Sequence, residues 1–250
     1  MEPLAVRIPP EIDPPLRAAT VGAGVVRGAV AATLPATLAE RLRVLITEGK
    51  LPAGARLNER ALCLELGVSR TPLREAFRLL EADGLVVLNP NRGAQVVSMS
   101  ATDIRESFEL MAGLEALSGE LACQRITEAE ITEIRALTFE MLACHTRRDL
   151  PAYYHRNRMI HERINLAAGN AKLRQAYTSL NLRIQNLRFR SNFDEAKWQL
   201  AAGEHAQMVV ALEARDGAGL AEIMRRHLRQ KGEAVLEAML AADTPGGPMP

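Results

Sequence analysis

Apolar residues recur at helical spacing along most of the chain, with one interruption by two short β-prone runs. Before the interruption the pattern predicts three short helices: one over residues 35–49, one that follows Asn58, and one from Arg70 to Gly84. The β-prone runs 85–88 and 94–97 flank a segment of turn-forming residues, 89–93, which indicates a hairpin. Three short helices followed by a hairpin predict a winged helix-turn-helix.

From residue 101 onward β-prone runs are almost absent. The pattern predicts six helices, over residues 102–125, 128–146, 149–168, 170–191, 195–215 and 217–242. Thr127, with Glu130 three residues later, has the spacing of a helix start, and Asp149 before Pro151 has another. We therefore expect a mainly α protein: an N-terminal winged helix-turn-helix with a small β-hairpin wing, and a C-terminal all-α helical bundle.

These patterns divide the chain into four segments. We expect a flexible N-terminal extension over residues 1–33, because it lacks periodicity and is rich in proline near its start: Pro3, Pro9, Pro10, Pro14 and Pro15. Residues 34–99 form the predicted winged helix-turn-helix, residues 100–243 form the helical domain, and residues 244–250 form a flexible tail.

The third predicted helix carries two stripes of different chemistry. Apolar residues recur at i, i+4 and i+7 and arginines at i, i+4 and i+8: Leu73, Phe77 and Leu80, and Arg70, Arg74 and Arg78. Ser69 has the type and position of an N-cap, and Gly84 of a terminating residue. A helix with one buried face and one arginine face suits the major groove of DNA. Arginine stripes also occur on surface helices, where they pair with nearby glutamates.

Composition says less about function than the pattern of apolar residues does. The net charge is +1, so the chain lacks the global basic character of a nonspecific nucleic-acid binder. Its three cysteines, Cys63, Cys123 and Cys144, have no metal-binding spacing and are expected to be buried thiols in a reducing cytoplasm. No signal peptide is recognisable, and the most apolar early stretch, 21–34, is too short to cross a bilayer, so we expect no membrane partner.

Histidines are confined to the second half of the chain. His161 follows Asn157 by four residues, so both lie on one face of a predicted helix, while His205 and His227 fall on two other helices. Three imidazoles in a bundle can converge on one metal ion, with the Asn157 oxygen as a fourth ligand. Each histidine can instead be a surface or hydrogen-bonded core residue, which is what we expect of the remaining two, His145 and His155.

The segment from about Leu38 to Val97, which contains VSRTPLREA and a downstream NRGA, resembles the DNA-binding domain of the GntR family of bacterial transcription regulators. The resemblance implies that Arg60, Arg70 and Arg74 contact the operator, a double-stranded, palindromic DNA site. It also implies that Ser69 and Thr71 lie near phosphates, and that Gly93 is the glycine of the wing. Arg92, at the tip of the predicted wing, is suited to the minor groove or to a flanking phosphate.

The segment from about Ile104 to Leu236 resembles the all-helical FCD effector domain of the FadR subgroup of that family. The similarity rests on DIRESFELMAGLE, on HERI followed by AAGN, on the pair Glu204-His205, and on His227. Many members bind a divalent metal through an acidic residue and three histidines. The resemblance therefore implies a metal of the zinc, nickel or manganese class at His161, His205 and His227.

Two positions depart from the subgroup's pattern. Asn157 stands where an aspartate is usual, and an amide oxygen is a weaker ligand than a carboxylate. Met111 stands where the first helix of the domain typically carries an arginine. Arg183, Arg188 and Arg190 are candidate effector-binding residues in its place, although each is more readily a solvated arginine on a helix face.

The resemblance implies a ligand-responsive DNA-binding transcription regulator, commonly a repressor, that acts as a homodimer in the cytoplasm and binds a small-molecule effector such as a carboxylate. The alternative is a metal-dependent hydrolase in which the three histidines hold a metal that activates water and Glu204 acts as the base. The chain lacks an HExxH motif, a nucleophile elbow and a phosphate-binding glycine loop, so we do not expect an enzyme.

Overall fold

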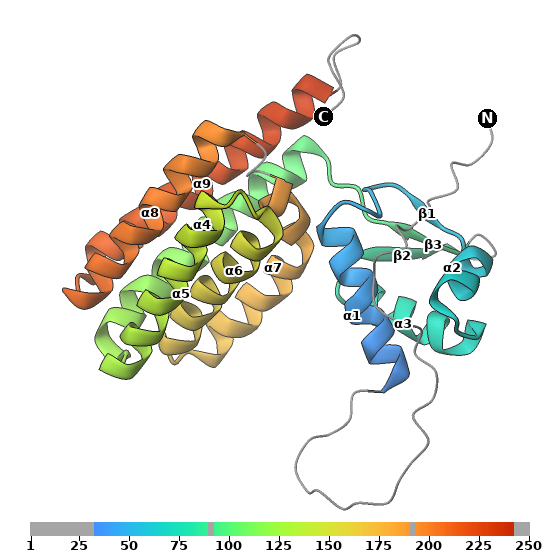
Figure 1. Cartoon of the computed structure of the whole chain (residues 1–250), viewed down its shortest axis with the longest axis horizontal. Coiled ribbons are helices and arrows are strands. Elements are labelled where there is room, and N and C mark those ends of the chain that lie inside the picture. The colour runs from blue at the N-terminus through green and yellow to red at the C-terminus, as the bar shows by residue number, and fades with distance from the viewer. Residues whose placement is uncertain (1–32, 90–92, 191–193, 243–250) are drawn as a thin grey trace, which may run out of the picture. The chain divides into compact units, whose positions relative to one another are not determined.

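The computed structural model describes residues 33–89, 93–190 and 194–242, and these divide into two units between Ser98 and Met99 (Figure 1). The predicted flexible segments, 1–33 and 244–250, lie outside the described residues except for Thr33. Within the described part the chain is mainly helical, as expected.

The first unit contains three helices and a three-stranded antiparallel sheet. Its elements are α1 (Leu34–Thr47), β1 (Arg56–Leu57), α2 (Glu59–Leu66), α3 (Arg70–Ala82), β2 (Val86–Asn89) and β3 (Gly93–Val96). The strands lie in the order β1-β3-β2, with Val86 opposite Val96 and Leu57 opposite Ala94. The three predicted helices and the predicted hairpin are confirmed.

Strand β1 was not predicted. Its two residues, Arg56 and Leu57, are too few to show an alternating pattern, and their pairing with β3 joins positions almost 40 residues apart in sequence. Leu57 is buried, and Gln95 of β3 donates its side-chain amide to the Gly54 carbonyl at 2.9 Å. The strand therefore ties the turn after α1 to the hairpin.

Helix α3 packs its apolar face on α1. Leu73 and Phe77 of α3 and Leu38 and Leu42 of α1 are all buried in one core. Asn58 caps α2 by accepting from the Ala61 N–H at 3.1 Å, as the sequence indicates. The expected cap of α3 is wrong in detail, because Ser69 occupies the N-cap position without a side-chain capping hydrogen bond.

The second unit is a bundle of helices: α4 (Ala101–Arg125), α5 (Glu128–Thr146), α6 (Leu150–Ala167), α7 (Ala171–Arg190), α8 (Glu195–Glu213) and α9 (Gly217–Ala242). The predicted boundaries differ from these by at most two residues. Thr127 and Glu130 form the expected capping box of α5, and Asp149 caps α6 by accepting from Ala152 N–H. No helix in the described ranges combines the length and the apolarity needed to cross a membrane.

Helices α4 and α9 lie closely along one another in the bundle. Two glycines permit this approach: a Cβ at Gly119 would lie 2.8 Å from Met224 Sδ, and one at Gly232 would lie 2.9 Å from Phe108 Cβ. Cys123 and Cys144 are buried in the bundle as expected, whereas Cys63 of the first unit is half-buried.

Candidate DNA-reading surface and metal centre

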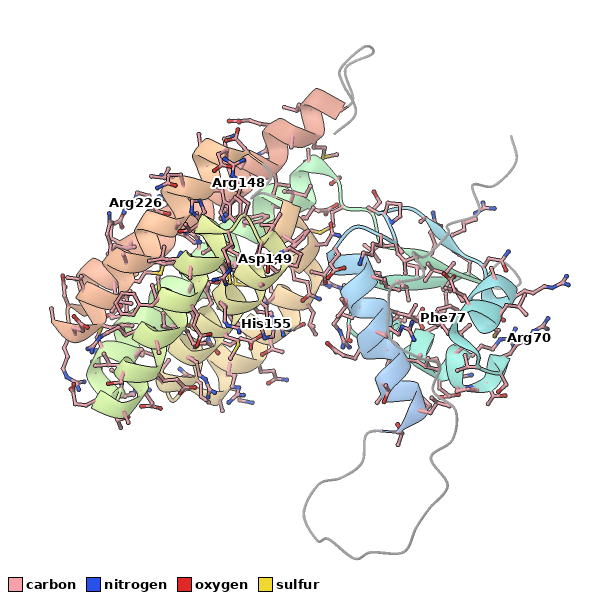
Figure 2. All side chains as sticks on the ribbon, in the orientation of Figure 1. Arg70, Phe77, Arg148, Asp149, His155 and Arg226 are labelled. Atoms are coloured by element: carbon pink, nitrogen blue, oxygen red, sulfur yellow. The ribbon has the colours of Figure 1, made fainter. Side chains whose placement is uncertain are left out.

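Helix α3 has the two faces that its sequence predicts. Its apolar residues are buried, and its three arginines, Arg70, Arg74 and Arg78, are exposed. Figure 2 shows the side chain of Arg70 at the outer edge of the unit and Phe77 inside it. A rigid helix with a row of exposed guanidinium groups can present hydrogen-bond donors to base edges and phosphates.

Arg74 is held in a fixed orientation by a neighbouring helix. Its Nε donates to both carboxylate oxygens of Glu59, at 3.1 and 3.2 Å, and Glu59 belongs to the first turn of α2. The guanidinium remains mostly exposed. Because the ion pair uses only Nε, the two terminal nitrogens of the guanidinium are available to DNA. Together they can donate two parallel hydrogen bonds to O6 and N7 of guanine.

The other predicted DNA contacts fall in three groups. Arg60 of α2 and Ser69 and Thr71 at the start of α3 are exposed near this surface. Arg92 lies outside the described residues. Gly93 adopts a φ of +76°, and a Cβ there would lie 3.4 Å from the Leu57 carbonyl oxygen, so the wing position favours glycine for backbone reasons.

In the second unit, three histidines from three helices meet in the bundle. One ring nitrogen from each of His161, His205 and His227 lies within 4.8 Å of the other two, and all three residues are buried. The Nε2 atoms of His161 and His205 are 3.2 Å apart. The convergence predicted for these residues is therefore present in the structure.

The opposite nitrogen of each ring faces a hydrogen-bond acceptor. His161 Nδ1 lies 2.6 Å from Glu115 Oε2, His205 Nδ1 lies 2.7 Å from the Ala201 carbonyl oxygen, and His227 Nδ1 lies 2.7 Å from Glu204 Oε2. Because a carbonyl and a carboxylate accept, the neutral rings of His205 and His227 carry their protons on Nδ1. The Nε2 lone pairs of these two rings then point toward the place where the three histidines meet.

The donor set fits a divalent metal ion. Nitrogen ligands about 2.1 Å from a tetrahedral ion lie about 3.4 Å from one another, close to the 3.2 Å between His161 and His205. Burial, followed by the charges of the neighbouring histidines, holds the pKa of His205 well below its ordinary value, and burial does the same for His227. Carboxylates behind two of the three rings are the second layer that orients metal-binding histidines in proteins.

Asn157 lies beside this centre, as predicted. Its side-chain nitrogen, Nδ2, is 3.0 Å from His205 Nε2, and the residue is buried. In this orientation the amide donates to the lone pair of His205. The Asn157 oxygen would have to turn inward to become a ligand.

Glu115, which the sequence analysis did not identify, joins the histidine centre to Arg188. Arg188 Nη1 donates to Glu115 Oε1 and to Asn181 Oδ1, both at 2.9 Å, and both residues of the ion pair are buried. Burial raises the pKa of Glu115, but His161 and Arg188 outweigh it and hold the pKa at about 2. A signal was present: Glu115 follows Met111 by four residues on the otherwise apolar face of α4.

The positions of Arg183, Glu204 and the two remaining histidines bear on the roles predicted for them. Arg183 lies on the exposed face of α7, so the structure does not bring it to the buried cluster that contains Arg188. Glu204 is an unsuitable general base, because its two oxygens bind His227 and Arg226. His155 (labelled in Figure 2) is exposed on the bundle. The ring of His145 packs on that of Trp198, with 4.5 Å between the ring centroids.

We expect Glu115→Gln to lower the free energy of unfolding of the second unit by about 3–5 kcal/mol, because it leaves the buried Arg188 without its counter-charge. Urea unfolding in the presence of a chelator measures this without a metal contribution. Glu133→Gln is the matched control, since the Glu133–Arg163 pair is exposed and should contribute less than about 1 kcal/mol. Equal effects of the two changes would contradict the role assigned to Glu115.

A cavity of about 130 Å³ lies between α8 and α9 and reaches one histidine of the centre. His227, Glu204 and Lys231 line it on the inner side, and Lys197 and Glu237 form an ion pair along it. Lys231 is buried, and burial followed by the charge of Arg188 lowers its pKa to about 7. A small molecule in this cavity can therefore approach both His227 and an amine.

Comparisons with known proteins agree with both units. Residues 34–96 match the family described as bacterial regulatory proteins, gntR family, and residues 106–230 match the FCD domain. The "Probable D-xylose utilization operon transcriptional repressor" of Paenarthrobacter nicotinovorans is 30% identical over 171 residues, which are 68% of this chain and 75% of that protein.

Two further proteins illustrate the range of similarity. The uncharacterized HTH-type transcriptional regulator YdhC of Bacillus subtilis (strain 168) is 39% identical over 92 residues, which are 37% of this chain and 41% of that protein. The solved structure of E. coli McbR/YncC has the same fold, with a TM-score of 0.73 at 21% identity over 84% of this chain and 99% of that one. The gntR family and the two relatives compared by sequence are described as transcriptional regulators or repressors, and not as enzymes. The chain therefore belongs to the GntR family of bacterial regulatory proteins and is a DNA-binding transcription regulator with an FCD domain.

Proposed function

We propose that this protein is a metal-dependent, metabolite-responsive repressor of the FadR subgroup. The observation that carries the proposal is the buried centre of three histidines beside a cavity, in a chain whose other unit is a DNA-reading domain. A relative that is named as a transcriptional repressor supports the direction of control.

His161, His205 and His227 would hold the divalent ion through Nε2, and Asn157 would add its amide oxygen. The bound ion would supply a Lewis-acidic position that accepts an oxygen of the effector. Arg188 would act through Glu115, whose carboxylate fixes the ring of His161. Arg183 has no part in this site.

The effector that suits the site is a small carboxylate. Lys231 would provide a positive group at the inner side of the cavity, next to His227, a ligand of the proposed metal, and a carboxylate would suit both. A cavity of about 150 Å³ accommodates benzene, so the cavity between α8 and α9 suits a metabolite of about six non-hydrogen atoms.

DNA recognition would require a homodimer. One winged helix-turn-helix contacts few base pairs, whereas two copies related by a two-fold axis read both halves of a palindrome. Effector binding in the bundle would change operator affinity through the segment that joins the two units, near Ser98.

A fluorescence-anisotropy titration tests this function. The operator is first selected from a library of random-sequence duplexes, and small carboxylates such as acetate, lactate, pyruvate and malonate are then added to the complex. We expect one of them to release the DNA from metal-loaded protein and not from chelator-treated protein. Release that is independent of metal, or hydrolysis of a substrate without any effect on DNA binding, would contradict the proposal.

Lys231→Met should raise the effector concentration that releases half of the DNA roughly 10-fold or more, because a hydrogen bond to a charged group contributes about 1.5–3 kcal/mol. Metal content should not change. Lys197→Met is the control, since Lys197 lines the same cavity but is half-buried, whereas Lys231 is buried beside His227. An equal shift in both variants would argue against a direct contact between Lys231 and the effector.

A further inference from the structure

Two buried polar side chains lie next to Asn157 and have no role in the site described above. Tyr153 is one helical turn before Asn157 on α6, and Trp198 is on α8. Their rings meet edge to face, with centroids 5.2 Å apart. Tyr153 Oη and Trp198 Nε1 are both buried and have no hydrogen bond of good geometry within the described ranges. Unmatched buried polar atoms of this kind are rare and call for an explanation.

The Tyr153 hydroxyl is within reach of both the Asn157 amide and the Trp198 indole. Burial raises the pKa of Tyr153, and the side chains of Asn157 and Trp198 act on the hydroxyl in the opposite direction. A phenol oxygen has two lone pairs, and an indole N–H can only donate. Tyr153 Oη can therefore accept one hydrogen bond from Trp198 Nε1 and a second from the Asn157 amide.

The Asn157 amide has two orientations with different consequences. With Nδ2 toward His205 it donates to the His205 Nε2 lone pair, as the 3.0 Å distance indicates. A metal ion takes that lone pair, and the amide N–H would then point at a cation. If the Asn157 amide flips so that its oxygen and nitrogen exchange places, Oδ1 faces the ion. Nδ2 then points away from the ion and needs a hydrogen-bond acceptor there.

We propose that Tyr153 is a positioning residue that turns the Asn157 amide oxygen toward the metal, with Trp198 holding the phenol in place. The inference rests on the metal site proposed above. Once the amide has turned, Asn157 Nδ2 donates to Tyr153 Oη, and the unmatched oxygen in the core gains its partner. A carboxylate at residue 157 would need no such partner, because its two oxygens are equivalent.

The different needs of an amide and a carboxylate at residue 157 can be tested by experiment. The zinc affinity of the full-length protein is measured by competition with a chromophoric chelator, for Tyr153→Phe alone and combined with Asn157→Asp. We expect Tyr153→Phe to weaken zinc binding roughly 10- to 100-fold in the protein that keeps Asn157. Loss of a hydrogen-bond partner of a metal ligand typically has an effect of this size. In the Asn157→Asp protein the same change should cost less than about 3-fold.

Tyr154→Phe serves as the matched control. Tyr154 is the next residue on α6 and is also buried, but its hydroxyl donates to the Gln185 carbonyl at 2.8 Å. Its removal should leave zinc affinity unchanged. Trp198 is the only tryptophan of the chain, so its emission reports on the same place. Zinc should change that emission in the wild-type protein and much less in Tyr153→Phe.

Each alternative result has a distinct meaning. An equal loss with and without the Asn157→Asp change would mean that Tyr153 acts through packing, and no loss in either protein would mean that it has no role; both overturn the inference. Zinc binding by Asn157→Asp but not by the wild type would also overturn it, because Asn157 would then not be a ligand. Failure of both proteins to bind zinc, nickel or manganese would remove the proposed metal site itself.

Discussion

Arg70→Ala and Arg74→Ala should each weaken binding to the selected operator roughly 30-fold or more. A bidentate contact between arginine and guanine contributes about 1–3 kcal/mol, and a homodimer on a palindrome loses it in both half-sites. Both side chains are exposed on α3, so the fold should not change. Fluorescence anisotropy with the specific and a scrambled duplex measures the loss, and circular dichroism checks the fold.

Arg74 allows a sharper version of this test. Glu59 already engages its Nε, which leaves the planar fork aimed outward. Arg74→Lys keeps the charge but not the fork, and we expect it to lose nearly as much specific affinity as Arg74→Ala. A lysine that restores specific binding would mean that Arg74 contacts a phosphate and does not read a base.

Arg78→Ala is the control on the same helix. Arg78 is exposed and pairs with Glu75 at 2.5 Å, and it lies furthest from the start of α3. Its loss should have a small effect that is similar on specific and scrambled DNA. If the specific operator is still bound tightly after Arg70→Ala and Arg74→Ala, then α3 is not the recognition helix.

The elements of this protein could be predicted well because their signals are local. Periodicity located the helices, and short-range side-chain patterns such as Thr127 with Glu130 located their ends. Strand β1 was missed because its order depends on pairing with β3, a contact between distant positions. The side-chain cap expected of Ser69 was missed for a related reason, since residue type alone does not determine which way a hydroxyl points.

The candidate metal centre was predicted in part, and that part rests on the resemblance to the FCD domain. Residue type alone leaves each histidine open to an ordinary surface or core position, and His161, His205 and His227 were distinguished by their match to the histidines of the FCD domain. Glu115 and Tyr153 did not, because a buried partner is defined by what it faces on other helices. Arg183 and Arg188 were indistinguishable in sequence, yet only Arg188 lies on the buried side of α7.

His205→Ala should abolish stoichiometric metal binding. His205 lies next to both His161 and Asn157, so its removal takes away one of three nitrogen ligands and the neighbour of the fourth ligand. Zinc sites bind with about 10–16 kcal/mol in all, or about 3 kcal/mol for each ligand, so the affinity should fall roughly 100-fold or more. Elemental analysis after dialysis should find about one ion per wild-type chain and almost none in the variant.

Thermal unfolding provides an independent readout of the same change. A metal that binds the folded state raises the melting temperature of the wild-type protein in proportion to its affinity, and this rise should disappear in His205→Ala. His155→Ala is the control, because His155 is exposed on α6, the helix that also carries His161. If the melting temperature of His205→Ala still rises with zinc as in the wild type, the ion binds elsewhere.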